Sequence, residues 1–158
     1  MTPSPTPSSL AEASAGCVSF HLRRSARTIT QFYDRVLSPS GLRSTQFTLL
    51  TLIRKAGGLP FSALAEALGM DRTTLTRNLR PLERDRLVKI EAGADRRVRI
   101  VRLTPEGERK QKDAEPLWAR AHARMVSGIG GSTWKSLRND LSRAIAVGLE
   151  ATAEQEQP

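Results

Sequence analysis

The sequence has 158 residues but only one cysteine, Cys17, so a single chain cannot form a disulfide. Two histidines and one cysteine also fall short of the usual ligand set of a zinc site, and we expect no metal and no cofactor. Aromatic residues make up only 4% of the chain, so its core must be aliphatic. No apolar run reaches the roughly 18 residues of a membrane-spanning helix, and no membrane partner is expected.

The N-terminal residues 1–9 lack both the basic start and the apolar stretch of a signal peptide. They are rich in proline, serine and threonine, and their side chains carry no charge. This composition predicts a disordered tail over residues 1–9 and a cytoplasmic protein.

Acidic residues are outnumbered, and the formal net charge is +9. Residues 71–110 carry twelve basic and seven acidic side chains, so they hold more than half of that excess. Residues 111–158 carry six of each and are neutral. A basic segment of this kind favours a polyanionic partner, whereas the neutral C-terminal third needs another role.

Apolar side chains recur every three or four residues along most of the chain, which predicts amphipathic helices. Two β-prone stretches flank a turn in which Gly93 is available for a positive φ, and they predict a hairpin. The chain is therefore expected to be mainly α with a small β-hairpin. The expected helices span residues 10–37, 45–56, 61–68, 72–85 and 105–126, with a last helix after a glycine turn at 128–131, and the expected strands span 87–91 and 98–103.

Residues 61–85 have the pattern of a helix-turn-helix, in which the second helix enters the major groove of DNA. We expect Asp71 to cap that second helix. Its apolar face consists of Leu75, Leu79 and Leu82, and its opposite face carries hydrogen-bond donors. Arginine and threonine can read base edges, and polar side chains can hold phosphates. We assign Arg72, Thr73, Thr76 and Arg77 to bases, and Thr74, Asn78 and Arg80 to phosphates.

The hairpin that follows is expected to act as a basic wing. Arg96 and Arg97 lie at its tip, and Arg99 lies on its second strand. A tip arginine suits a narrow minor groove, where the potential is most negative. Asp95 is expected to orient a neighbouring arginine through an ion pair. An exposed basic surface without DNA contacts is the alternative interpretation of the helix and hairpin.

These residues resemble the MarR family of bacterial transcriptional regulators. The most specific segment is Asp95-Arg96-Arg97 followed by Leu103-Thr104-Pro105-Glu106-Gly107. It is similar to the wing signature of that family, Asp-x-Arg followed by Leu-Thr-x-x-Gly. Further similar stretches lie at residues 41–47, 64–76 and 79–84.

The resemblance implies a winged helix-turn-helix core over residues 41–103, with dimerisation helices over residues 10–37 and 104–153, in a single domain. It implies a homodimer that binds double-stranded DNA at a pseudo-palindromic operator, usually as a repressor. A small-molecule effector, commonly an aromatic or phenolic acid, often relieves that binding. The apolar stripe of the last helix independently favours a dimer, although it could instead close the core of the monomer.

Several single residues are candidates for sensing. Ligand-pocket candidates are His21, Tyr33, Arg43, Trp118 and His122, each of which could instead be an ordinary surface or core residue. Cys17 offers an alternative function, a regulator that senses oxidant, but the sequence favours a packing role for this small side chain.

Two other classes of function compete with a transcriptional regulator. An enzyme is disfavoured because the sequence has no glycine-rich phosphate loop, nucleophile elbow or paired carboxylates. A winged module that binds RNA or another protein remains an alternative. Binding to duplex DNA in competition with RNA separates this module from a transcriptional regulator.

Overall fold

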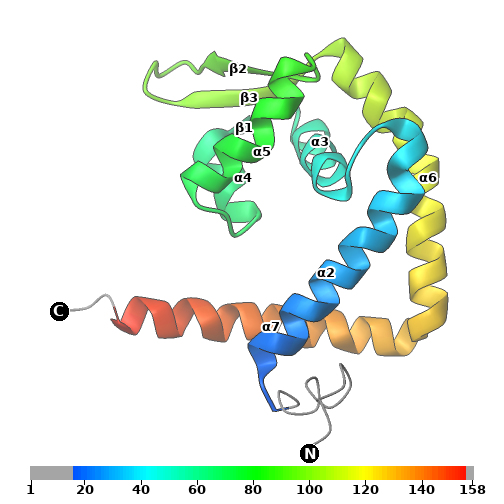
Figure 1. Ribbon diagram of the computed structural model, residues 1–158. Coiled ribbons are helices and arrows are strands. Elements are labelled where there is room, and N and C mark those ends of the chain that lie inside the picture. The colour runs from blue at the N-terminus through cyan, green and yellow to red at the C-terminus, as the bar shows by residue number, and fades with distance from the viewer. Residues whose placement is uncertain (1–15, 156–158) are drawn as a thin grey trace, which may run out of the picture. The chain divides into compact units, whose positions relative to one another are not determined.

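The computed structural model describes residues 16–155 (Figure 1). The tail predicted over residues 1–9 lies outside this range, as do residues 10–15 of the predicted first helix. The first described helix, α2, spans Val18–Leu37. Its N-cap is Cys17, which has extended backbone angles (φ −90°, ψ 110°), so residues 16 and 17, which the sequence predicts to be helical, are not. The predicted start at Leu10 lies outside the described residues. Gly16 precedes this cap, and glycine disfavours continuing a helix.

Mainly helical structure with one small sheet confirms the predicted fold class. The sheet has three antiparallel strands in the order β1–β3–β2, because a two-residue strand joins the predicted hairpin. Val101 of the middle strand lies opposite Leu59 on one side and Ile90 on the other. The remaining elements are a 3-10 turn at Ser38–Ser40, α3 (Ser44–Ala56), β1 (Leu59–Pro60), α4 (Phe61–Ala67), α5 (Arg72–Arg84), β2 (Val88–Ala92), β3 (Arg99–Leu103), α6 (Pro105–Ile129) and α7 (Gly131–Gln155).

The core is aliphatic, as the composition predicts. Among the described residues, Phe47 is the only aromatic side chain in the buried cluster, and it stacks on Trp118 with a centroid distance of 5.8 Å. The other large buried aliphatic side chains come from the end of α2, from α3, α4 and α5, and from the sheet, so the helix-turn-helix and the hairpin share one core. They include Leu37, Leu49, Leu50, Ile53, Leu64, Leu75, Leu79, Leu82 and Val101.

Helices α3 and α6 are joined by polar contacts beside this core. Gln111 is fully buried, and its amide Nε2 donates to Thr51 Oγ1 at 3.2 Å. One turn further along each helix, Arg54 pairs with Glu115 at 3.1 Å. These two contacts, one turn apart on each helix, set the register of α6 against α3 and so hold Trp118 beside Phe47.

The chain forms two compact units, one ending at Trp118 and the other starting at Ala119, whereas the sequence predicts a single domain. The second unit contains the end of α6 and all of α7, and an edge contact between His122 and Trp134 packs these two helices. Several apolar side chains of α7 are exposed, including Ile145 and Leu149 at 64% and 67%. In the described chain, the helices are too short or too polar to cross a membrane.

Candidate nucleic-acid interface and pocket

The helix-turn-helix is closed by a tight turn between α4 and α5. Gly69 adopts a φ of 59°, which glycine tolerates best, and Met70 N donates to Ala65 O at 2.9 Å. The turn places Met70 against the core and leaves Asp71 at the start of α5. The predicted helix-turn-helix is therefore present at the predicted residues.

Asp71 caps α5 as predicted. Its Oδ1 accepts the backbone N–H of Thr74 at 2.7 Å, and its Oδ2 accepts the hydroxyl of Thr74 at 2.8 Å. These hydrogen bonds favour the ionised carboxyl and hold the pKa of Asp71 below its ordinary value. The negative charge also complements the partial positive charge at the N-terminus of the helix.

The two faces of α5 divide as the sequence predicts. Leu75, Leu79 and Leu82 are buried. Two of the seven predicted contact residues, Thr74 and Asn78, are half-buried, and Asn78 Nδ2 donates to Thr74 O at 3.0 Å and contacts Met70 Sδ at 3.6 Å. The other five are exposed: Arg72, Thr73, Thr76, Arg77 and Arg80.

The wing turn differs from its prediction in two details. Asp95 forms no ion pair with an arginine in the described chain, and instead its Oδ1 accepts the backbone N–H of Arg97 at 2.9 Å. Gly93 does not have a positive φ. A β-carbon at Gly93 would lie 3.2 Å from the carbonyl oxygen of Val98, so this glycine serves close packing of the two strands. Asp95 therefore shapes the main chain that carries Arg96 and Arg97.

The hairpin lies beside α5 (Figure 1), and arginines of both elements share a cleft of about 340 Å³. Its lining includes Arg72 of α5, Arg97 of the wing turn and Arg99 of β3. The guanidinium of Arg72 lies over the ring of Phe61, 5.5 Å from its centroid, which fixes its position at the start of α5. An adjacent hollow continues along α5 past Thr76 and Arg80. Folding thus brings Arg72 together with Arg97 and Arg99 in one cleft, whereas Thr73, Arg77 and Arg96 line neither hollow.

Two contacts that sequence reasoning missed hold the base of the wing. Thr104 Oγ1 donates to Arg86 O at 2.6 Å and accepts Gly107 N–H at 3.0 Å, so one hydroxyl joins the strand connection to α6. On β3, Arg102 donates to Gly57 O at 2.5 Å, which directs it away from the wing tip. The Leu-Thr-x-x-Gly spacing in the sequence could have indicated the hydrogen bonds of Thr104.

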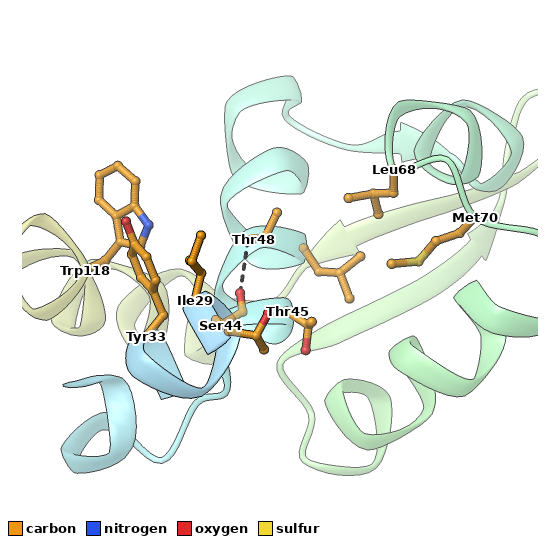
Figure 2. A pocket seen from close by; sticks show the side chains of 10 residues that line it. Ile29, Tyr33, Ser44, Thr45, Thr48, Leu68, Met70 and Trp118 are labelled. Carbon is orange, nitrogen blue, oxygen red and sulfur yellow. Dashed lines mark hydrogen bonds between the residues drawn. The ribbon is translucent and has the colours of Figure 1, made fainter. Parts of the chain in front are cut away.

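A separate pocket of about 280 Å³ lies within the first unit, between α2, α3 and the turn before α5 (Figure 2). It contains two of the predicted ligand candidates, Tyr33 and Trp118, while the remaining lining residues were not predicted. Ile29 and Tyr33 lie four residues apart on α2, and this helical spacing could have indicated that they face the same pocket. The full lining consists of Ile29, Thr30, Tyr33, Ser44, Thr45, Thr48, Leu49, Leu68, Met70 and Trp118.

The other sensing candidates lie elsewhere. Arg43 lines a different hollow and pairs with Asp34 at 3.9 Å, and neither it nor His21 lines the pocket of Tyr33. His122 contacts Trp134 in the second unit. Cys17 is exposed at the N-cap of α2 rather than inside the helix.

A helix-turn-helix braced by a three-stranded sheet with a basic hairpin defines a winged-helix protein. The sequence model of the MarR family matches residues 42–98. The HTH-type transcriptional regulator YwoH of Bacillus subtilis is 32% identical over 92 residues, covering 58% of this chain and 67% of that protein. The chain belongs to the MarR family of transcriptional regulators and, like its relatives, is not an enzyme.

Solved structures agree with this assignment. The transcriptional regulator MosR of Mycobacterium tuberculosis, crystallised with DNA, is 40% identical, with a TM-score of 0.76 and coverage of 87% of this chain and 97% of that one. CouR of Rhodococcus jostii, crystallised with p-coumaroyl-CoA, is 26% identical, with a TM-score of 0.67 and coverage of 78% and 88%.

Proposed function

We propose that this chain represses transcription by binding a pseudo-palindromic DNA operator as a homodimer, and that a small ligand releases it. The observation that carries the proposal is the shared basic surface of α5 and the wing, where Arg72, Arg97 and Arg99 line one cleft. The MosR relative crystallised with DNA supports DNA as the partner.

Residues of the recognition helix α5 are assigned to two kinds of DNA contact, with base edges and with phosphates. Thr73 and Arg77 lie outside the two clefts beside the wing, exposed on the recognition helix, and are assigned to base edges together with Arg72 and Thr76. Arg80, one turn from Arg77, is assigned to a phosphate. Thr74 and Asn78 already bond within the helix-turn-helix, so they act by holding α5 in place as well as through any phosphate contact. Arg96, Arg97 and Arg99 supply wing contacts over a main chain shaped by Asp95.

The proposed dimer is supported by exposed apolar side chains in the predicted dimerisation helices. In the first unit, Val18 and Leu22 of α2 are 68% and 40% exposed. In the second unit, Ile145 and Leu149 of α7 are exposed to a similar extent. Burying such side chains between two copies is favourable, and two-fold symmetry then sets the half-sites about one turn of DNA apart.

The pocket of Tyr33 and Trp118 is the proposed effector site, and Met70 is its connection to DNA binding. Met70 lines the pocket, its sulfur contacts Asn78 of α5, and it immediately precedes the cap Asp71. A ligand that displaces Met70 therefore shifts the first turns of the recognition helix. The CouR relative, crystallised with an aromatic acyl-CoA, supports a ligand site in this family.

The test is fluorescence anisotropy with the full chain and a library of DNA duplexes containing inverted repeats. We expect selection of one inverted repeat, with an affinity that falls steeply as salt rises, because basic side chains displace counterions. Arg138→Ala, which removes an exposed arginine of α7, is the matched control for substitutions on α5. Preference for RNA, or equal binding to every duplex, would reject the proposal.

Met70→Leu tests the route of release separately. Leucine keeps the apolar wall but removes the sulfur that contacts Asn78. We expect this variant to bind the selected duplex as the wild type does, yet to require a higher concentration of effector for release. Unchanged release would show that the signal reaches α5 by another route.

A further inference from the structure

The described lining residues of the effector pocket include no aspartate, glutamate, lysine, arginine or histidine. Its polar atoms are the hydroxyls of serine, threonine and tyrosine and the indole N–H of Trp118. The rest of the wall is apolar, with Leu68 and Met70 at the end away from Tyr33 and Trp118 (Figure 2). The pocket therefore offers hydrogen bonds but no counter-ion for a charged ligand.

The charged groups next to the pocket would also disfavour an anion. Asp34 Oδ1 accepts the backbone N–H of Ser44, a lining residue, at 2.7 Å. The cation that pairs with Asp34 is Arg43, whose side chain is 79% exposed and lies outside the pocket. A ligand carboxylate held against this wall would lose part of its hydration and meet no cation among the described lining residues, which is unfavourable.

The hydroxyl groups suit a neutral polar substituent. Thr48 Oγ1 donates to Ser44 O at 3.0 Å, so toward the pocket its oxygen can only accept a hydrogen bond. Burial raises the pKa of the Tyr33 phenol above its ordinary value, so this ring also stays uncharged at neutral pH. At about 280 Å³ the pocket is at the small end of ligand sites and fits one ring or two fused rings.

We infer that the effector of this protein is an uncharged planar aromatic compound that carries a hydroxyl or carbonyl group, rather than the phenolic acid that the family resemblance implies. The inference rests on the proposed function, because it assigns a ligand class to the proposed effector site. The rings of Tyr33 and Trp118 provide aromatic surface at one end, and the hydroxyls of α3 read the polar substituent.

The test compares 2-naphthol with 2-naphthoate, which differ in charge at pH 7 but share the same ring system. Isothermal titration calorimetry with the full chain should give about tenfold tighter binding for 2-naphthol, since the carboxylate loses hydration against the pocket wall without gaining a cation. Thr45→Trp should fill the pocket and abolish binding. Thr28→Trp, on the exposed surface of α2, is the matched control and should leave it unchanged.

A variant that is expected to gain binding of 2-naphthoate tests the inference even if Thr45→Trp fails to fold. Thr48 is exposed to solvent at the pocket wall, so Thr48→Arg can place a cation there without entering the core. We expect this variant to gain about tenfold or more in affinity for 2-naphthoate. Wild-type binding of 2-naphthoate at least as tight as that of 2-naphthol, removed by Thr45→Trp, would overturn the inference, as would no binding of either compound.

DNA release separates this inference from the proposed function. If 2-naphthol binds and the protein leaves its selected duplex, both are supported. If 2-naphthol binds in the pocket while DNA stays bound, the ligand class is supported and the proposed release is rejected.

Discussion

The main chain of Gly107 passes directly against the carbonyl group of Leu87. A β-carbon at Gly107 would overlap Leu87 O, and Leu87 O itself accepts the backbone N–H of Thr104 at 3.1 Å. Leu87 precedes β2, and Gly107 lies in the first turn of α6. The close approach therefore joins the base of the wing to the helix that follows it.

Replacing Gly107 with alanine should destabilise the protein by about 1–3 kcal/mol, because the added methyl group forces two packed main-chain segments apart. Gly128→Ala is the control, since a β-carbon there meets no other atom and alanine favours the helix. Urea denaturation measures both free energies of unfolding. Equal stability of Gly107→Ala and the wild type would contradict the assigned contact.

The cap of α5 should make stability depend on pH in the acidic range. The pKa of Asp71 is lowered by folding, so its stabilising contribution is complete above its unfolded pKa of about 3.9. That contribution is lost as pH falls through the lower folded pKa. Asp71→Asn keeps an N-cap acceptor but removes the charge.

The measurement is the difference in Tm between wild type and Asp71→Asn from pH 7 to pH 2.5. We expect a constant difference down to about pH 5 and a shrinking one below pH 4. A difference that stays constant to pH 2.5 would mean that the charge of Asp71 does not stabilise the cap.

The two basic elements should differ in how they affect DNA recognition. Arg77→Ala should cost about 1–3 kcal/mol on the selected operator and relax base preference at one position. Arg97→Ala should weaken selected and random duplexes by similar factors, because a wing contact in the minor groove is less specific. Anisotropy titrations on both duplexes test this, and equal losses on both for Arg77→Ala would reject its assignment to a base.

Exposed apolar side chains of α7 should govern self-association. Ile145→Glu places a charge on a side chain that is 64% exposed in the monomer, so it should leave the fold intact and favour monomers. Ser142→Glu, on the same helix at an already polar position, is the control. Sedimentation velocity reads the oligomeric state, and a dimer that withstands Ile145→Glu would exclude this part of α7 from the interface.

The elements of the fold were predictable because their signals are local. The leucines of α5 recur at helical spacing, Asp71 precedes them as a cap, and a short glycine turn separates α4 from α5. The exposed donors of α5 follow directly from that spacing. Residues 16 and 17 are predicted to be helical but precede α2, because apolar periodicity does not mark where a helix begins, whereas the extended backbone of Cys17 does.

Other parts of the site depend on contacts that sequence spacing does not encode. Asp95 was expected to pair with an arginine side chain, but it is close enough to accept the N–H of Arg97 in its own turn. The pocket brings Ile29, Thr48, Leu68 and Trp118 together from four separate segments. Only the packing of α2, α3 and α6 on one core makes these residues neighbours. The sequence therefore predicted Tyr33 and Trp118 as single candidates but not the pocket wall as a whole.

One peptide bond separates the wall of the pocket from the cap of the recognition helix, since Met70 and Asp71 are consecutive residues. Under the proposed function, a substitution at residue 70 that moves the main chain of this turn would change the response to the ligand and the placement of the recognition helix together. One that keeps the turn, as Met70→Leu is expected to do, would change the response to the ligand alone.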